Sequence, residues 1–146
     1  MQGMKAAVVL SAVVGVAFGA TLVSAQGPVT EADYEGAMKE LGYLVNDAAM
    51  HIDASYFGDL GEDSDKLYTQ LTKVETFWKA QEQAKAVEIA GQALAAISGI
   101  SRASGAEDGP AATAALADLR KTCTACHGEF REETADGFRI KPDALK

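Results

Sequence analysis

Apolar residues recur along this chain in alternating steps of three and four, the spacing that places them on one face of an α-helix. The first such stripe follows Thr30, a residue type that caps helices, and Glu31 and Asp33 occupy the next turn. The stripe comprises Tyr34, Met38, Leu41, Val45, Ala48 and Ile52. This pattern predicts one continuous amphipathic helix.

Three further stripes with similar spacing follow. They comprise Leu67, Leu71, Val74 and Trp78, then Val87, Ala90, Leu94 and Ile97, and finally Leu116, Leu119, Cys123, Cys126 and Phe130. No stretch shows the strict alternation of apolar and polar residues that marks half-buried strands. The sequence therefore predicts an all-α fold, an antiparallel four-helix bundle.

Glycine, proline and short polar segments predict where these helices begin and end. Gly58 and Gly61 interrupt the pattern between the first two stripes, and the composition of residues 104–109 is that of a loop. Pro110 fits the first turn of the fourth helix, where its missing N–H costs nothing. We expect that helix to end at residues 134–137.

The first 25 residues have the layout of a secretory signal peptide. Lys5 precedes an apolar run from Ala6 to about Val23, and the small residues Ser24 and Ala25 suit a cleavage site after Ala25. An uncleaved membrane anchor is the alternative, because the run approaches the roughly 20 residues that span a bilayer. We expect cleavage, export to the periplasm, and a single mature domain over residues 26–146 with no membrane span.

The mature chain is acidic. Removing residues 1–25 takes away one of the 13 basic residues and none of the 21 acidic ones, which leaves a net charge of −9. Nucleic acid and anionic membranes are therefore poor partners, whereas a basic docking surface on another protein would be attracted. The acidity could equally serve solubility alone.

The chain contains two cysteines, and they occur as Cys123-Thr124-Ala125-Cys126-His127. This arrangement is the attachment signature of a c-type haem. The two thiols add across the vinyl groups of the macrocycle, and the imidazole that follows lies beneath the iron. We expect one covalent haem c at Cys123 and Cys126, with His127 as the proximal iron ligand.

Three other uses of the cysteine pair stay open. A thioredoxin-like redox pair normally lies at a strand-to-helix junction, and no strand is predicted. A zinc site needs four ligands, but His51 is the sole other histidine. A structural disulfide suits an exported protein, yet it would close a very short loop and leave His127 unexplained.

From Thr30 to Arg131 the chain resembles cytochrome c prime and its relatives, the class II c-type cytochromes. The specific part is the motif from Thr122 to His127 with Phe130 and Arg131 after it; the stretch from Met38 to Gly42 is weaker. The resemblance implies a haem inside the bundle, between the motif helix and the start of the first helix. It also implies a non-enzymatic protein that passes electrons to redox partners or binds gas, often as a homodimer.

Met38 occupies the distal position that the resemblance implies. A methionine that coordinates iron there gives a low-spin electron carrier, whereas an open distal face binds nitric oxide or carbon monoxide. A thioether stabilises ferrous iron, so Met38 favours the carrier, although methionine also fills gaps in cores. Met50 lies about 18 Å further along the same helix, too far from Met38 to coordinate the same iron, so we expect it in the core. His51 is interpreted as an ordinary surface or helix-end histidine.

The resemblance assigns Phe130 and Arg131 to the haem environment. In a continuing helix Arg131 lies one turn after His127, where it would contact a propionate or tune the iron; a solvated arginine at a helix C-terminus is the alternative. Many relatives carry an arginine one turn before the distal residue, where this chain has Tyr34. Trp78 is expected in the core, and residues 136–146 alternate apolar and basic side chains without a derived role.

Overall fold

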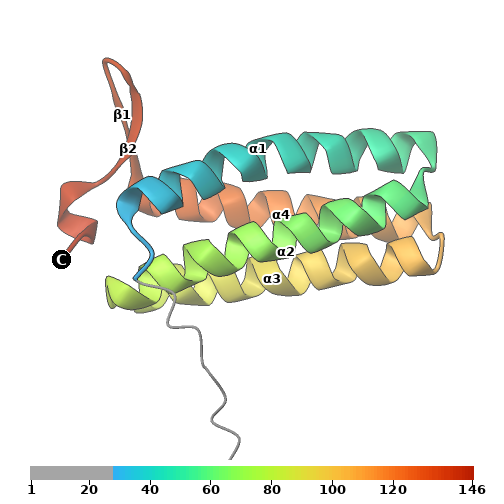
Figure 1. Cartoon of the computed structure of the whole chain (residues 1–146), viewed down its shortest axis with the longest axis horizontal. Coiled ribbons are helices and arrows are strands. Elements are labelled where there is room, and N and C mark those ends of the chain that lie inside the picture. The colour runs from blue at the N-terminus through green and yellow to red at the C-terminus, as the bar shows by residue number, and fades with distance from the viewer. Residues whose placement is uncertain (1–27) are drawn as a thin grey trace, which may run out of the picture.

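A computed structural model describes residues 28–146, so the predicted signal peptide at residues 1–25 lies outside the described residues. Four helices form most of the described chain: α1 (Glu31–Ala54), α2 (Phe57–Ala80), α3 (Ala84–Gly105) and α4 (Gly109–Phe130). They lie side by side in an elongated bundle (Figure 1). After them come β1 (Arg131–Thr134), β2 (Gly137–Ile140) and a short 3-10 helix, Pro142–Ala144.

Consecutive helices are the principal packing partners in the bundle. α1 packs on α2, α2 on α3 and α3 on α4, whereas α1 and α4 touch over far fewer residues. Short connections between these helices make neighbours antiparallel (Figure 1). The predicted antiparallel four-helix bundle is confirmed, and none of the described helices is long and apolar enough to span a membrane.

The first helix begins where the sequence predicts. The Thr30 Oγ1 atom accepts a hydrogen bond from the Asp33 N–H at 3.2 Å, and the Asp33 carboxylate accepts one from the Thr30 N–H at 2.9 Å. This reciprocal capping box satisfies N–H groups that the first turn leaves without partners. The Asp33 carboxylate also accepts a 2.6 Å hydrogen bond from the Thr30 hydroxyl, and this bond together with the one from the Thr30 N–H lowers the pKa of the Asp33 carboxyl.

The predicted break at Gly58 and Gly61 is wrong, because α2 begins at Phe57 and runs through both glycines. The chain reverses earlier, at Ser55, whose φ of 58° ends α1. Gly61 instead permits close packing: a Cβ there would lie 3.2 Å from the Ser104 Oγ. Ser104 belongs to α3, which extends to Gly105, so the expected loop at residues 104–109 is shorter than predicted.

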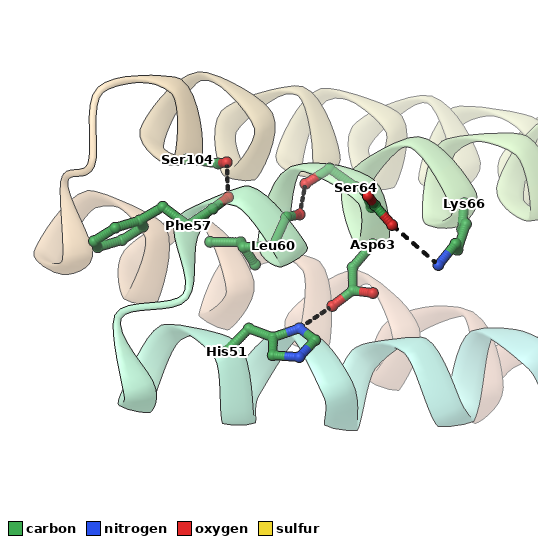
Figure 2. A network of polar contacts seen from close by, with 8 residues as sticks. His51, Phe57, Leu60, Asp63, Ser64, Lys66 and Ser104 are labelled. Carbon is green, nitrogen blue, oxygen red and sulfur yellow. Dashed lines mark hydrogen bonds and ion pairs between the residues drawn. The ribbon is translucent and has the colours of Figure 1, made fainter.

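The α1–α2 turn is held by polar contacts of buried groups (Figure 2). The Ser104 Oγ donates a hydrogen bond of 2.6 Å to the Phe57 carbonyl oxygen and so joins the end of α3 to the start of α2. On the other side, the His51 Nδ1 of α1 lies 2.7 Å from the Asp63 Oδ2 of α2. Asp63 is 4% exposed, so the partly exposed His51 imidazole supplies a polar partner to a buried carboxylate.

The fourth helix ends at Phe130, earlier than the predicted residues 134–137. The chain then forms an antiparallel hairpin in which Arg131 pairs with Ile140 and Thr134 with Gly137. Gly137, at a φ of 132°, supplies the conformation that closes it. The Lys141 Nζ donates to the carbonyl oxygens of Gly128 and Glu129, which satisfies acceptors that a continuing helix would have used.

Aromatic side chains fill the core at the end of the bundle that carries the hairpin. The Tyr34 and Phe77 ring centroids are 4.6 Å apart, and those of Trp78 and Phe130 are 5.1 Å apart. Trp78 is fully buried, as expected of a core residue. This cluster fixes the first turns of α1 against the last turns of α2 and α4.

Candidate functional site

Two cavities lie beside each other where α1 faces α4. The bundle cavity, of about 410 Å³, is lined by residues of all four helices. The end cavity, of about 440 Å³, is lined by the first turns of α1, the last turns of α4 and the hairpin. Met38, Cys126 and His127 line both cavities, so these three side chains stand at the boundary between them.

The bundle cavity is largely apolar. Its walls include Leu41, Val45, Leu71, Val74, Ile89, Ala90, Ala93 and Leu119, together with the Cys123 side chain. Small residues on α3 contribute to its width, because alanine side chains fill less of the interior than leucine or isoleucine would. Such a space suits a flat hydrophobic group that reacts with two thiols, because Cys126 also lines it.

The end cavity is polar at its rim. Glu35 and Lys39 of α1 lie at this rim with Arg131, Asp136 and Arg139 of the hairpin. Tyr34 also lines it, and burial raises the pKa of the Tyr34 phenol, which therefore stays neutral. Cationic groups at the mouth of a cavity suit a ligand with carboxylate substituents.

The two thiols are half-buried and are not joined by a disulfide. Burial raises the pKa of the Cys123 thiol, and it raises that of Cys126 to about 11, with further contributions from Cys123 and Glu129. Redox-active dithiols instead depend on a lowered pKa that produces a thiolate. The electrostatics therefore disfavour the thioredoxin-like alternative.

The His127 imidazole is also half-buried. Burial and, to a lesser extent, the nearby Arg131 charge lower its pKa below the usual value. The ring is therefore neutral near pH 7, which is the form that can coordinate a metal through nitrogen. Met38, which lines the same two cavities from α1, is half-buried.

The structure brings together most of the residues that the sequence singles out. Met38, Cys126 and His127 line both cavities, Cys123 lines the bundle cavity, and Phe130 and Arg131 line the end cavity. Arg131 is there for a different reason than expected, since it begins a strand rather than continuing a helix.

Other expectations change. Met50, expected in the core, is 59% exposed, and His51 is paired with Asp63. Sequence reasoning also missed the hairpin residues Asp136, Phe138 and Arg139 as cavity walls. The signal for them was the alternation of apolar and basic residues from Phe138 onward.

The donor set fits a covalent haem. Two thiols and a neutral imidazole lie on one helix, a thioether lies on the facing helix, and an apolar cavity adjoins one with cations at its rim. No group of three or more His, Cys, Asp or Glu side chains within residues 28–146 is arranged to hold a metal ion directly. A haem iron needs none, because the macrocycle supplies four of its ligands.

Comparison with known proteins agrees with this chemistry. The family model described as Cytochrome C' matches residues 20–131, which is most of the chain. Neither the curated proteins nor the solved structures contain a match. The chain therefore belongs to the cytochrome c prime family and is a c-type cytochrome, an electron carrier or gas binder with one covalently bound haem c.

Proposed function

We propose that the protein is a periplasmic one-electron carrier, with a single haem bonded to Cys123 and Cys126 and an iron ligated by His127 and Met38. The observation that carries the proposal is the position of the two axial candidates. Met38 on α1 and His127 on α4 line the same two cavities from facing helices, and Cys126 lies with them. A haem bonded at this motif would thus meet a thioether on its other side.

The surrounding residues would hold the haem by ordinary complementarity. The apolar walls of the bundle cavity would exclude water from a bound macrocycle, and Cys123 lines that cavity. The rim of the end cavity offers Lys39 and Arg131 to the propionates, beside Phe130. The apolar macrocycle would thus lie in the apolar bundle cavity, and its propionates would lie at the polar rim of the end cavity.

The bound haem supplies one-electron exchange between ferric and ferrous iron. The chain's contribution is to set the potential and to limit movement. A Met38 thioether favours ferrous iron and raises the reduction potential, as does burial away from water. Met38 lies within α1 and His127 in the last turn of α4, so helical backbone would hold both ligands and limit their movement during electron transfer.

The remaining features of the proposal concern place and partners. Export through residues 1–25 puts the chain in the periplasm, where it takes an electron from a donor protein and passes it to an acceptor. Its net charge of −9 after cleavage attracts partners with a basic docking surface, and a homodimer is compatible with the family. No substrate bond is made or broken.

Replacing Met38 by Ala tests the ligation. Loss of the thioether leaves the sixth position open, so we expect the ferric iron to change from low-spin to high-spin and the ferrous protein to bind carbon monoxide. Met50→Ala is the matched control, since Met50 lies on the same helix but is 59% exposed. Electron paramagnetic resonance and visible spectra of both variants provide the measurement.

Ferric iron that stays low-spin in Met38→Ala would contradict the carrier proposal. If the parent protein is already high-spin and binds carbon monoxide, the assignment moves to a gas-binding protein in which Met38 is a wall of an open distal pocket.

A further inference from the structure

The charges of the described chain are unevenly distributed along the bundle. The α1–α2 and α3–α4 turns lie together at one end, and the hairpin lies at the other (Figure 1). We call the first the acidic end and define it as residues 53–66 and 102–108, where Lys66 and Arg102 are the basic side chains. Its exposed carboxylates are those of Asp53, Asp59, Glu62, Asp65, Glu107 and Asp108.

The mouth of the end cavity, at the opposite end of the bundle, is nearly balanced in charge. Lys39, Arg131 and Arg139 line this cavity together with two acidic residues, Glu35 and Asp136. All five side chains are exposed. The small cationic excess would be offset by haem propionates at this mouth. The mouth is therefore close to neutral, although the mature chain has a net charge of −9.

The acidic end is too distant for its charges to act at the mouth. Asp53 lies 15 residues after Met38 on α1, which is about 22 Å at a rise of about 1.5 Å per residue. The Debye length is about 10 Å at an ionic strength of about 0.1 M, so exposed charges at that separation are largely screened. The net charge that attracts a basic partner from a distance therefore does not hold a partner at the mouth.

Phe138 supplies an apolar contact at this mouth. Its side chain lines the end cavity and is exposed on the hairpin, and the Arg131 guanidinium carbon lies 4.1 Å from its ring centroid. The hairpin itself is anchored, because Ile140 is buried and the Gln83 side chain donates a 2.9 Å hydrogen bond to the Ala144 carbonyl oxygen. The ring is thus presented in a defined place, and aromatic residues are enriched where proteins contact one another.

We propose that the hairpin and the rim of the end cavity form the electron-exchange face of the protein, and that its partner is a redox protein whose own contact face is apolar and weakly charged. The acidic end takes no part in this contact. The inference rests on the proposed haem in the two cavities and extends to residues after 131, where the family match ends. Electron-transfer complexes bury little surface, so a small apolar contact such as Phe138 is enough to seat the partner.

Two inorganic oxidants of opposite charge locate the exchange face. Hexacyanoferrate(III) is an anion, and tris(phenanthroline)cobalt(III) is a cation. The readout is the ratio of their rate constants for oxidising the reduced holoprotein, measured by stopped flow at an ionic strength of about 0.1 M. A change in reduction potential alters both rate constants in the same direction, so the ratio reports the charge near the point of electron exchange.

Phe138→Glu adds a negative charge at the mouth, and Tyr56→Glu is the matched control near the acidic end. Both replace an aromatic side chain that is largely exposed, at 62% and 60%, so both variants should fold as the parent does. A charge within a Debye length repels the anion and attracts the cation, so the anion-to-cation ratio of Phe138→Glu should fall about tenfold. Tyr56→Glu should keep the parent ratio. Equal ratios in the two variants overturn the proposal.

Electron self-exchange between two copies of the holoprotein tests the apolar contact, because each copy presents such a face. Phe138→Ser removes the ring without adding charge, so self-exchange should slow by about fivefold or more. Tyr56→Ser should exchange as the parent does. Line broadening in nuclear magnetic resonance spectra of mixed oxidised and reduced protein measures these rates, and equal rates in Phe138→Ser and the parent would contradict an apolar contact at the hairpin.

Failure of the proposed function is separately visible. Absence of covalent haem in the parent overturns both proposals. A high-spin parent that binds carbon monoxide removes Met38 ligation alone, because the ratio of the two oxidants still decides where an external partner exchanges electrons with the haem.

Discussion

Met38 on α1 and His127 on α4 line the same cavities although 88 residues separate them in the sequence. The sequence motif alone identified His127, because the spacing of Cys123, Cys126 and His127 has a direct chemical meaning. Met38 could be selected only through the family resemblance, since methionine on an apolar stripe is ordinary. A functional residue that belongs to a local sequence motif can thus be predicted from the sequence more easily than one whose partner is distant in the sequence.

The His51–Asp63 pair predicts a coupled loss of stability. Asp63 is 4% exposed and its carboxylate lies 2.7 Å from the His51 Nδ1, so removing His51 leaves a buried carboxylate without its partner, whereas removing Asp63 leaves a partly exposed imidazole that water can reach. We therefore expect His51→Ala to lower the free energy of unfolding by about 1–3 kcal/mol, and Asp63→Ala to lower it by less. Chemical denaturation monitored by circular dichroism measures this.

The double variant provides the control for that prediction. Because both single changes break the same contact, the loss in His51→Ala/Asp63→Ala should be smaller than the sum of the two single losses. Strict additivity would show that the pair contributes no interaction energy.

Among the elements, helices were predicted well and their ends less so. The capping residue Thr30 and the early proline Pro110 marked true helix starts, because both signals act through local backbone hydrogen bonding. Gly61 was misread as a breaker, since its role is to admit the Ser104 side chain from α3, a distant contact. The hairpin was also missed because it depends on distant contacts. The Lys141 Nζ donates hydrogen bonds to the carbonyl oxygens of Gly128 and Glu129 at the end of α4.

Gly58 and Gly61 should respond differently to alanine. Both lie in α2, but a Cβ at Gly58 meets nothing within 4 Å, whereas one at Gly61 meets the Ser104 Oγ at 3.2 Å. Gly58→Ala should therefore raise the free energy of unfolding by about 0.5–1 kcal/mol, through lower backbone entropy in the unfolded chain. Gly61→Ala should show no such increase in the free energy of unfolding, because the new methyl group would displace the Ser104 side chain. Thermal denaturation of both variants decides it, and equal stabilisation would contradict close packing at Gly61.

For the whole molecule, the decisive feature is the loose contact between α1 and α4. The apolar stripes predicted four helices and a bundle, and the structure confirms both. The stripes did not reveal that one helix pair stands apart, because periodicity reports which face is apolar and says nothing of the distance to the facing helix. That separation creates the two cavities which Met38, Cys126 and His127 share.

The most direct test of the central claim is the electron paramagnetic resonance and visible spectrum of the purified protein, oxidised and reduced, with and without carbon monoxide. A haem bonded at Cys123 and Cys126 and ligated by His127 and Met38 predicts a low-spin ferric signal, a sulfur-to-iron charge-transfer band and no response to the gas. High-spin iron that binds carbon monoxide would contradict Met38 ligation, and a protein without haem after expression with the attachment machinery would contradict the account as a whole.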